Sequence, residues 1–535
     1  MSVNFPLLPK EKKLALLQYA VACCILAYTV LPFLVLCRYV QPQRFEFWWP
    51  LDRTSLIYSL KSAIPGTRYV SIWENILWII AGDFTAAHLP QIVLIDKLFA
   101  CCIVLLFCAS LAALFRSLNT CVLHLEAPRF LLFLSLVFFF VLNAIRRLDY
   151  FFYDMVTTTG YTLGLSLSML YAASMISYYH KGNPVQLVWQ FLLAYVICGT
   201  IEYNICLPCF IAFLFAVLSV CKKKRLPLAA LVQILLCLIM FFLHIKAPGN
   251  ADGAKFAAYA RTDAVHQAES FAAVSAPAAP AADSPAPAGN AGAAAAEPAS
   301  IYSLTYFAAW CRSFRVFYSF SWSYVFRVQS LLLLALIYCF AAQGLRRIRV
   351  AWLLCIGAGA ELIGFAMFFA SYVVGMLGTW DSHLVQTPHV WLCMNHALLL
   401  LTLLRFFAGH YNLTLVPAAA ETRLLHVERL VRSPFMFLFC ILLFSCTREF
   451  PLHHAYADIL KGRARHYDQK IERIYQDILS SGADGAIVEG FASSENPNAL
   501  IFGNENAWNS TAAAVEPSVQ AFFAKPVTIV RPGQK

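Results

Sequence analysis

The chain has 535 residues, of which 60% are hydrophobic and 13% are charged, and its mean hydropathy is +0.65. A soluble globular domain carries about 25% charged residues, so this composition excludes an ordinary soluble protein and favours an integral membrane protein. The net charge is +11, but Lys and Arg gather beside apolar runs, as they do in membrane proteins. The expected partner is therefore the lipid bilayer, and no nucleic acid is expected.

Apolar runs long enough to cross a hydrocarbon core about 30 Å thick recur along the chain. The first is too long for a signal-peptide core and lacks a small-residue cleavage site, so we interpret it as a retained helix. We predict an all-α polytopic membrane protein with about 11 transmembrane helices. Their expected ranges are 14–37, 92–115, 130–146, 160–178, 185–201, 203–221, 226–246, 328–344, 350–372, 389–407 and 433–447.

Basic clusters set the expected orientation. Lys10, Lys12 and Lys13 precede the first helix, which predicts a cytoplasmic N-terminus. With eleven helices, three further clusters also fall on the cytoplasmic side, at 222–225, 346–349 and 423–432. The odd number of helices places the C-terminal tail outside. We therefore expect a multi-pass protein of the cytoplasmic (inner) membrane.

The segments expected outside the membrane differ in character. A loop at 38–91 contains aromatic clusters typical of interfacial helices. Residues 272–298 are almost entirely Ala, Pro, Gly and Ser, which predicts a flexible linker. Residues 1–450 thus form the transmembrane domain and 451–535 an extracytoplasmic segment. Helical periodicity from Ala455 to Leu479, followed by strand-like runs at 486–488, 499–502 and 527–530, predicts a small α/β appendage packed on the membrane part.

Motifs of soluble enzymes carry little signal. Cys206-Leu-Pro-Cys209 has redox spacing, but no thioredoxin-like pattern surrounds it. Three histidines lack a zinc signature, namely His383, His389 and His396. We expect no cofactor and no metal. Glu361 lies near the middle of an apolar run, and two interpretations stay open: a proton-relay carboxylate, or a neutral, hydrogen-bonded packing residue.

The informative residues lie at the outer ends of the expected helices. A charged group within hydrocarbon costs about 2.5–3.5 kcal/mol on insertion scales, so its presence suggests a use. Four polar groups from separate parts of the chain fall at one depth, which predicts a shared cavity. They are Asp52-Arg53, the stretch Asp149 to Tyr161 with Asp154 and Thr159, Glu202 with Asn204, and Lys246 to Asn250.

Several of these residues resemble motifs of the GT-C glycosyltransferases, especially bacterial relatives of the O-antigen glucosyltransferases. Tyr153 to Leu163 resembles the aromatic, Thr-Gly-containing entry to a helix in that family. Gly199-Thr-Ile-Glu202 resembles its Gly-x-x-Glu turn, and Ala247-Pro-Gly-Asn250 resembles the Pro-Gly-Asn that ends a central helix. In the tail, Glu505 to Asn509 with the following Phe522-Phe523 resembles a terminal motif. The resemblance implies a GT-C-like fold.

The resemblance also implies a chemistry. The donor would be a polyprenyl-phosphate-linked sugar, and the acceptor a cell-surface glycan or its lipid-linked precursor. Asp52 is the expected base for the acceptor hydroxyl, and Glu46 is the second candidate. Enzymes of this family usually carry paired acidic residues in this loop, whereas here Asp52 stands alone. Expected donors to the leaving phosphate are Arg53, Arg68 and Lys246. Expected to hold the sugar are Asp154, Thr159, Tyr161, Glu202 and Asn250.

Two other classes of function remain open at this point. A transporter or flippase for a similar amphiphile would use the same outward cavity, with Glu361 as a proton carrier. A non-catalytic membrane protein of envelope assembly would need no reacting groups. Formation of a product from a lipid-linked sugar would distinguish a glycosyltransferase from both of these classes.

Overall fold

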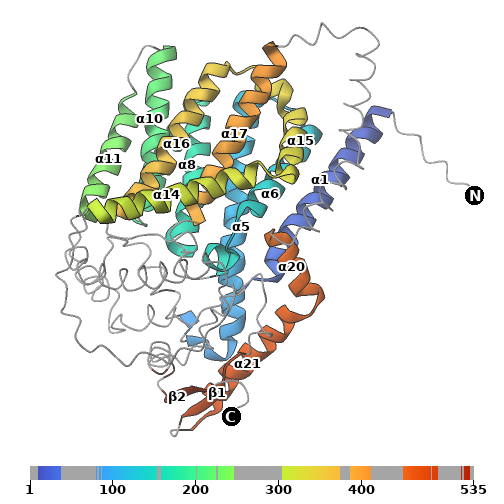
Figure 1. The fold of residues 1–535 in the computed structure, drawn as a ribbon, viewed down its shortest axis with the longest axis vertical. Helices are drawn as coiled ribbons and strands as arrows, with labels where there is room; N and C mark the ends of the chain where they lie inside the picture. Colours follow the sequence, from blue (N-terminus) through green and yellow to red (C-terminus); the bar gives the residue numbers. More distant parts are fainter. Residues whose placement is uncertain are drawn as a thin grey trace, which may run out of the picture.

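The computed structural model describes residues 10–37, 80, 84–85, 87–153, 158–200, 202–223, 227–245, 304–373, 386–410, 450–482, 485–491, 520, 523 and 525–530. Most of these residues belong to α-helices that run side by side in a bundle (Figure 1). A smaller unit from the end of the chain lies beyond one end of the bundle. The described part of the chain is therefore predominantly helical, as its composition predicts.

Ten of the predicted spans coincide with observed helices, and the span expected at 433–447 lies outside the described residues. Seven of these helices come from the first half of the chain: α1 (Lys10–Val35), α5 (Ile92–Leu118), α6 (Ala127–Ala144), α8 (Leu163–Lys181), α9 (Pro184–Cys198), α10 (Glu202–Lys223) and α11 (Leu228–Ile245). Three come from the second half: α15 (Val328–Leu345), α16 (Val350–Val373) and α17 (Gln386–His410).

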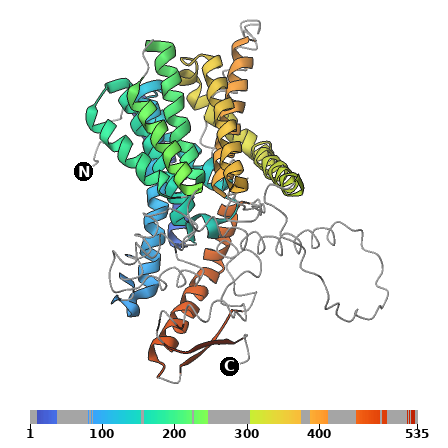
Figure 2. The same ribbon diagram turned by 90° about the vertical axis from the view of Figure 1, so that its left-hand side faces the viewer.

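Within the described residues, 6 helices are long and apolar enough to cross a membrane, or up to 7 if a bent helix pair counts as one span. Two shorter apolar helices, in α9 and α11, fall below that length. These helices indicate a multi-pass membrane protein. One apolar stretch, Leu89–Leu123, has 35 residues, which corresponds to about 50 Å of helix. It is longer than a hydrocarbon core, and the first turns of α5 accordingly extend past the bundle (Figure 2).

Helix α14 (Leu304–Val325) was not predicted; its residues were assigned to an outer loop. It lies across α16 and α17 rather than parallel to them (Figure 1), and its second half bends by 62° into α15. Its buried side chains recur at helical spacing, at Trp310, Phe317, Ser321 and Tyr324. The polar and aromatic mixture of this segment concealed the periodicity, because few of its residues are aliphatic.

The link between α6 and α8 contains two π-helical turns, η3 (Asp149–Tyr153) and η4 (Thr158–Thr162). Single π-turns within helical proteins are rare and frequently occur at functional sites. The helix expected from residue 160 is regular only from Leu163 onward. The backbone of this link is therefore irregular at the polar residues that were expected to begin a regular helix.

The tail forms the expected appendage. The single helix expected there is instead divided into two, α20 (Pro451–Leu460) and α21 (Arg463–Ser480). They are separated at Gly462, where the backbone φ of +71° favours glycine. Strands β1 (Ala486–Glu489) and β2 (Val527–Val530) pair in parallel, while the run at 499–502 lies outside the described residues.

The appendage packs on the membrane part, as predicted. Tyr456 stacks on Tyr28 of α1 with ring centroids 4.7 Å apart, and its hydroxyl donates to the Tyr28 carbonyl at 2.8 Å. On α21, Asp468 pairs with Lys97 of α5 at 2.8 Å. We call the end of the bundle that meets this unit the appendage end.

Basic residues mark the opposite end, which we call the basic end. Helix α8 ends at Lys181, and Arg346, Arg347 and Arg349 follow α15. Arg405, near the end of α17, donates to the Arg346 carbonyl at 3.2 Å. The predicted basic cluster at 346–349 therefore follows a helix end in the described part, whereas 423–432 lies outside it.

Candidate functional site

The structure describes few of the predicted site residues. Thr159 and Tyr161 are described with their side chains, and both are buried. Glu202 is described only as the first residue of α10. The others lie outside the described residues, namely Glu46, Asp52, Arg53, Arg68, Asp154, Lys246 and Asn250.

The described residues next to these segments lie at the appendage end. Helix α1 ends there, before the loop that carries Asp52. The Tyr153 hydroxyl, one residue before Asp154, donates to the Phe33 carbonyl near the end of α1 at 2.8 Å. Asn204, in the first turn of α10, donates through Nδ2 to the Gly160 carbonyl at 2.7 Å. Three of the sequence segments expected to share a site therefore leave or enter the bundle close together.

A buried polar cluster forms around η4. Asn204 Nδ2 also donates to Thr200 Oγ1 at 3.1 Å, and Thr158, Thr159 and Thr162 are at most 6% exposed. Gly164 lies against this cluster, and a Cβ there would come within 1.8 Å of Asn204 Nδ2, so glycine is required for the close approach of α8 and α10.

Two buried acceptor atoms of this cluster lack a hydrogen-bond partner within the described part of the chain. Asn204 Oδ1 and Thr158 Oγ1 are buried and have no hydrogen-bond partner among the described residues. Buried polar atoms in native proteins are nearly always paired, with protein or with a bound molecule. Both oxygens accept hydrogen bonds from hydroxyl groups, so the cluster offers acceptors to a hydroxyl-bearing ligand.

A buried ion pair lies beside this cluster. Arg147 Nε donates to Asp149 Oδ1 at 2.9 Å, and Nη2 donates to Oδ2 at 2.6 Å. Their side chains are only 2% and 7% exposed. The Arg147 guanidinium also lies 4.3 Å from the Tyr150 ring centroid, and the Arg147 amide donates to Gln386 Oε1 at 3.3 Å. The ion pair therefore lies within the α6–η3 link, and the backbone of that link is held to α17 by the bond to Gln386.

Asp149 was expected at this boundary from the sequence, whereas Arg147 was not. Because the guanidinium engages both carboxylate oxygens, Asp149 is committed to this pair and is not a free base. An arginine two residues before an aspartate, at the end of an apolar helix, was the available signal for the pair.

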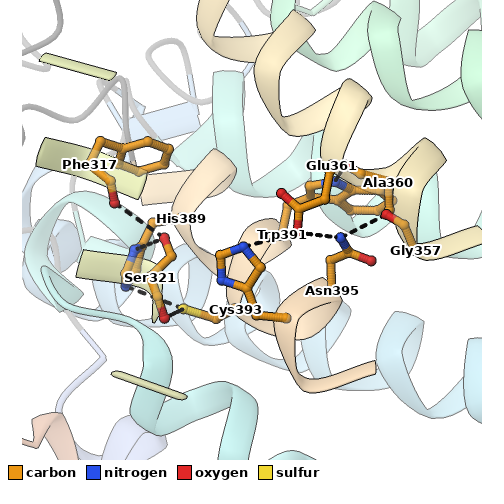
Figure 3. A network of polar contacts seen from close by, with 10 residues as sticks. Phe317, Ser321, Gly357, Ala360, Glu361, His389, Trp391, Cys393 and Asn395 are labelled. Carbon is orange, nitrogen blue, oxygen red and sulfur yellow. Dashed lines mark hydrogen bonds and ion pairs between the residues drawn. The ribbon is translucent and has the colours of Figure 1, made fainter. Parts of the chain in front are cut away.

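A second polar network lies within the bundle, around Glu361 of α16 (Figure 3). Asn395 Nδ2 donates to Glu361 Oε1 at 2.8 Å and to the Gly357 carbonyl at 3.0 Å. His396 Nε2 lies 2.9 Å from the same Oε1 atom. The Glu361 side chain is 21% exposed, whereas His396 is fully buried. Glu361 is thus held from one side by two neighbouring residues of α17.

The His396 ring is enclosed by aromatic side chains of α14. Trp322 stacks on it with centroids 3.9 Å apart and planes at 13°, and Tyr318 meets it edge-on at 5.2 Å. Although Nε2 is within ion-pair distance of Glu361, neither ring nitrogen has a hydrogen bond of good geometry within the described part of the chain.

His389 lies two turns before His396 on the same helix. Its Nδ1 is 3.0 Å from Ser321 Oγ of α14, and its Nε2 is 3.6 Å from Cys393 Sγ. The spacing of seven residues therefore places both histidines on the face of α17 that meets α14. His383 lies outside the described residues, and no group of three or more metal-ligating side chains occurs among the described ones.

Comparison with protein-family models, curated proteins and solved structures finds no match to this chain.

Proposed function

We propose that the chain is a GT-C-like membrane glycosyltransferase that moves a sugar from a polyprenyl-phosphate donor to a cell-surface glycan or its lipid-linked precursor. One observation carries the proposal: the described residues that flank the segments with the expected reacting groups lie at the bundle end where η4 and the start of α10 present two buried oxygen acceptors with no hydrogen-bond partner among the described residues. Sugars are rich in hydroxyl donors, which this cluster would bind.

The position of the cluster suits such a donor. The polyprenyl tail stays in the bilayer while the phosphate and sugar reach its aqueous boundary, so the site must lie at a membrane surface and open to both. In this proposal Asp52 takes the acceptor proton as the hydroxyl attacks the anomeric carbon. Arg53, Arg68 and Lys246 stabilise the phosphate that leaves. Thr159, Tyr161, Asp154, Glu202 and Asn250 surround the sugar.

The proposal requires the appendage end to face outward. The basic end adjoins Lys181 and the cluster at 346–349, and positive residues favour the cytoplasmic side. We therefore expect a reporter enzyme that works only outside the cytoplasm to be active when fused after Lys535 and inactive when fused at Arg347. Activity of a strictly cytoplasmic reporter after Lys535 would reverse the orientation and place the proposed site on the wrong side.

The function is tested with the purified full chain reconstituted in vesicles that contain a polyprenyl-phosphate-linked sugar and an acceptor glycan. We expect a new glycosidic bond, detected by mass spectrometry of the acceptor, and release of polyprenyl phosphate in equal amount. Movement of the lipid-linked sugar across the bilayer without bond formation would instead identify a flippase. Neither outcome across a panel of sugars would favour a non-catalytic role.

A further inference from the structure

A row of buried polar side chains runs along one face of α17. It consists of Gln386, His389, Cys393 and His396, which are 3%, 7%, 0% and 0% exposed. Their spacing of three, four and three residues places them on a single helical face. Between them along the helix lie buried apolar side chains such as Val390 and Leu392. The row is therefore a polar stripe along one face of a largely apolar span.

The stripe connects two distinct places. At the appendage end, Gln386 Oε1 accepts from the Arg147 amide at 3.3 Å. At its inner end, His396 Nε2 reaches Glu361 Oε1 at 2.9 Å. Between these ends, His389 contacts both Ser321 and Cys393, as Figure 3 shows. The stripe thus leads from the boundary of the bundle to a carboxylate near the middle of α16.

Helix packing alone does not account for these residues. Polar side chains that serve as packing contacts between membrane helices hydrogen-bond across the interface, as Asn395 does with Gly357. His396 Nδ1, although buried, has no partner among the described residues, and Glu361 remains partly exposed. An intramembrane carboxylate that is only partly paired is costly, and such groups typically belong to proton or substrate pathways.

We propose that Glu361 is a proton-binding site that is loaded from the appendage end through this stripe of α17. A proton from water at that end passes along His389 and His396, each of which accepts on one ring nitrogen and donates from the other. It comes to rest on the Glu361 carboxylate, next to His396 Nε2. The two histidines are seven residues apart, about 10 Å along the helix, and Cys393 lies between them on the same helical face.

Among the described residues, the charged and titratable groups that face Glu361 and the two histidines are Tyr318 of α14, which lies near Glu361, and Arg146, which follows α6 and acts electrostatically on His389 together with His396. This proton site is independent of glycosyl transfer, because neither Glu361 nor His396 belongs to the polar cluster at η4.

The test uses dicyclohexylcarbodiimide, an apolar reagent that adds the O–H of a protonated carboxyl group across its C=N bond to give an O-acylisourea, whose acyl group then migrates from oxygen to nitrogen to leave a stable N-acylurea. The full chain is reconstituted in one orientation in sealed vesicles, with the pH set separately on each side. Mass spectrometry of the α16 peptide then measures labelling of Glu361. The partial exposure of this side chain gives the reagent access from the lipid.

We expect labelling of Glu361 to follow the pH on the appendage side alone, and to fall by about tenfold per pH unit once the carboxyl is mostly ionised. Glu361→Gln should abolish labelling of this peptide. His396→Leu should remove the dependence on the pH of the appendage side, whereas His454→Leu in the appendage, the matched control, should leave it unchanged. The wild-type measurement needs no variant to fold. Labelling that ignores pH on both sides, follows the basic end, or is absent throughout would overturn the proposal.

Discussion

Replacing Arg147 with leucine is expected to destabilise the protein by about 3–5 kcal/mol, the usual cost of removing one partner from a buried ion pair. The reason is the neighbour that remains. Asp149 is only 7% exposed, and both of its carboxylate oxygens accept hydrogen bonds from the guanidinium. Without Arg147 the buried carboxylate loses the hydrogen bonds that both of its oxygens accept from the guanidinium. Thermal unfolding of the purified protein in detergent measures the loss.

Two further variants separate the charge effect from lost packing. The double variant Arg147→Leu/Asp149→Leu should recover most of the stability, because replacing a whole buried pair by apolar residues is often nearly neutral. Arg146→Leu is the matched control: Arg146 is exposed and its guanidinium lies over the Phe320 ring, a contact worth about 0.5–1 kcal/mol at an exposed site. Equal losses for Arg147→Leu and Arg146→Leu would contradict the buried pair.

Asp52→Asn is expected to lower the rate of sugar transfer by about 10²–10⁴-fold, the typical contribution of a positioned general base. The amide keeps the size of the side chain and cannot accept the proton of the acceptor hydroxyl. Expression and donor binding should therefore change little, so the loss appears in the turnover rate. The measurement is the vesicle transfer assay, with initial rates taken at saturating donor.

The control for this variant is Asp477→Asn, the same chemical change at an exposed position on α21, which should retain full transfer. If Asp52→Asn also retains full transfer, Asp52 is not the base and Glu46→Gln becomes the decisive variant. Full transfer by both variants would remove the carboxylate chemistry proposed for this loop. Loss of transfer accompanied by loss of folded protein would be detected by the expression check.

Much of the helical architecture was available from the sequence. About 20 consecutive apolar residues are needed to cross the bilayer. Helices such as α6, α10 and α16 can therefore be predicted from their length and composition, without reference to their neighbours. The helical part of the appendage was also predictable from the sequence, because the buried positions of α21 recur at helical spacing, at Tyr467, Ile471, Ile474 and Ile478.

The candidate site was predictable only in part. The polar run at Thr158 to Tyr161 stood out because polar residues are rare in this chain, and the structure buries it beside Asn204. The convergence of η4, the α10 start and the end of α1 depends on contacts between segments far apart in the sequence, such as Tyr153 with Phe33. No periodicity in a single segment specifies such a contact.

The sequence by itself determined what the solvent demands locally: which segments are apolar enough for the bilayer, and which ends carry basic residues. Only the tertiary structure decided which faces meet. Helix α14 lies across α16 and α17 because its aromatic side chains bury against them, a choice made between helices. Glu361 accepts a hydrogen bond from Asn395, which lies 34 residues away in the sequence, and no local sequence pattern predicts that contact. In a membrane every helix face is similarly apolar, so hydrophobicity selects the spans, whereas close packing and scarce polar contacts select their partners.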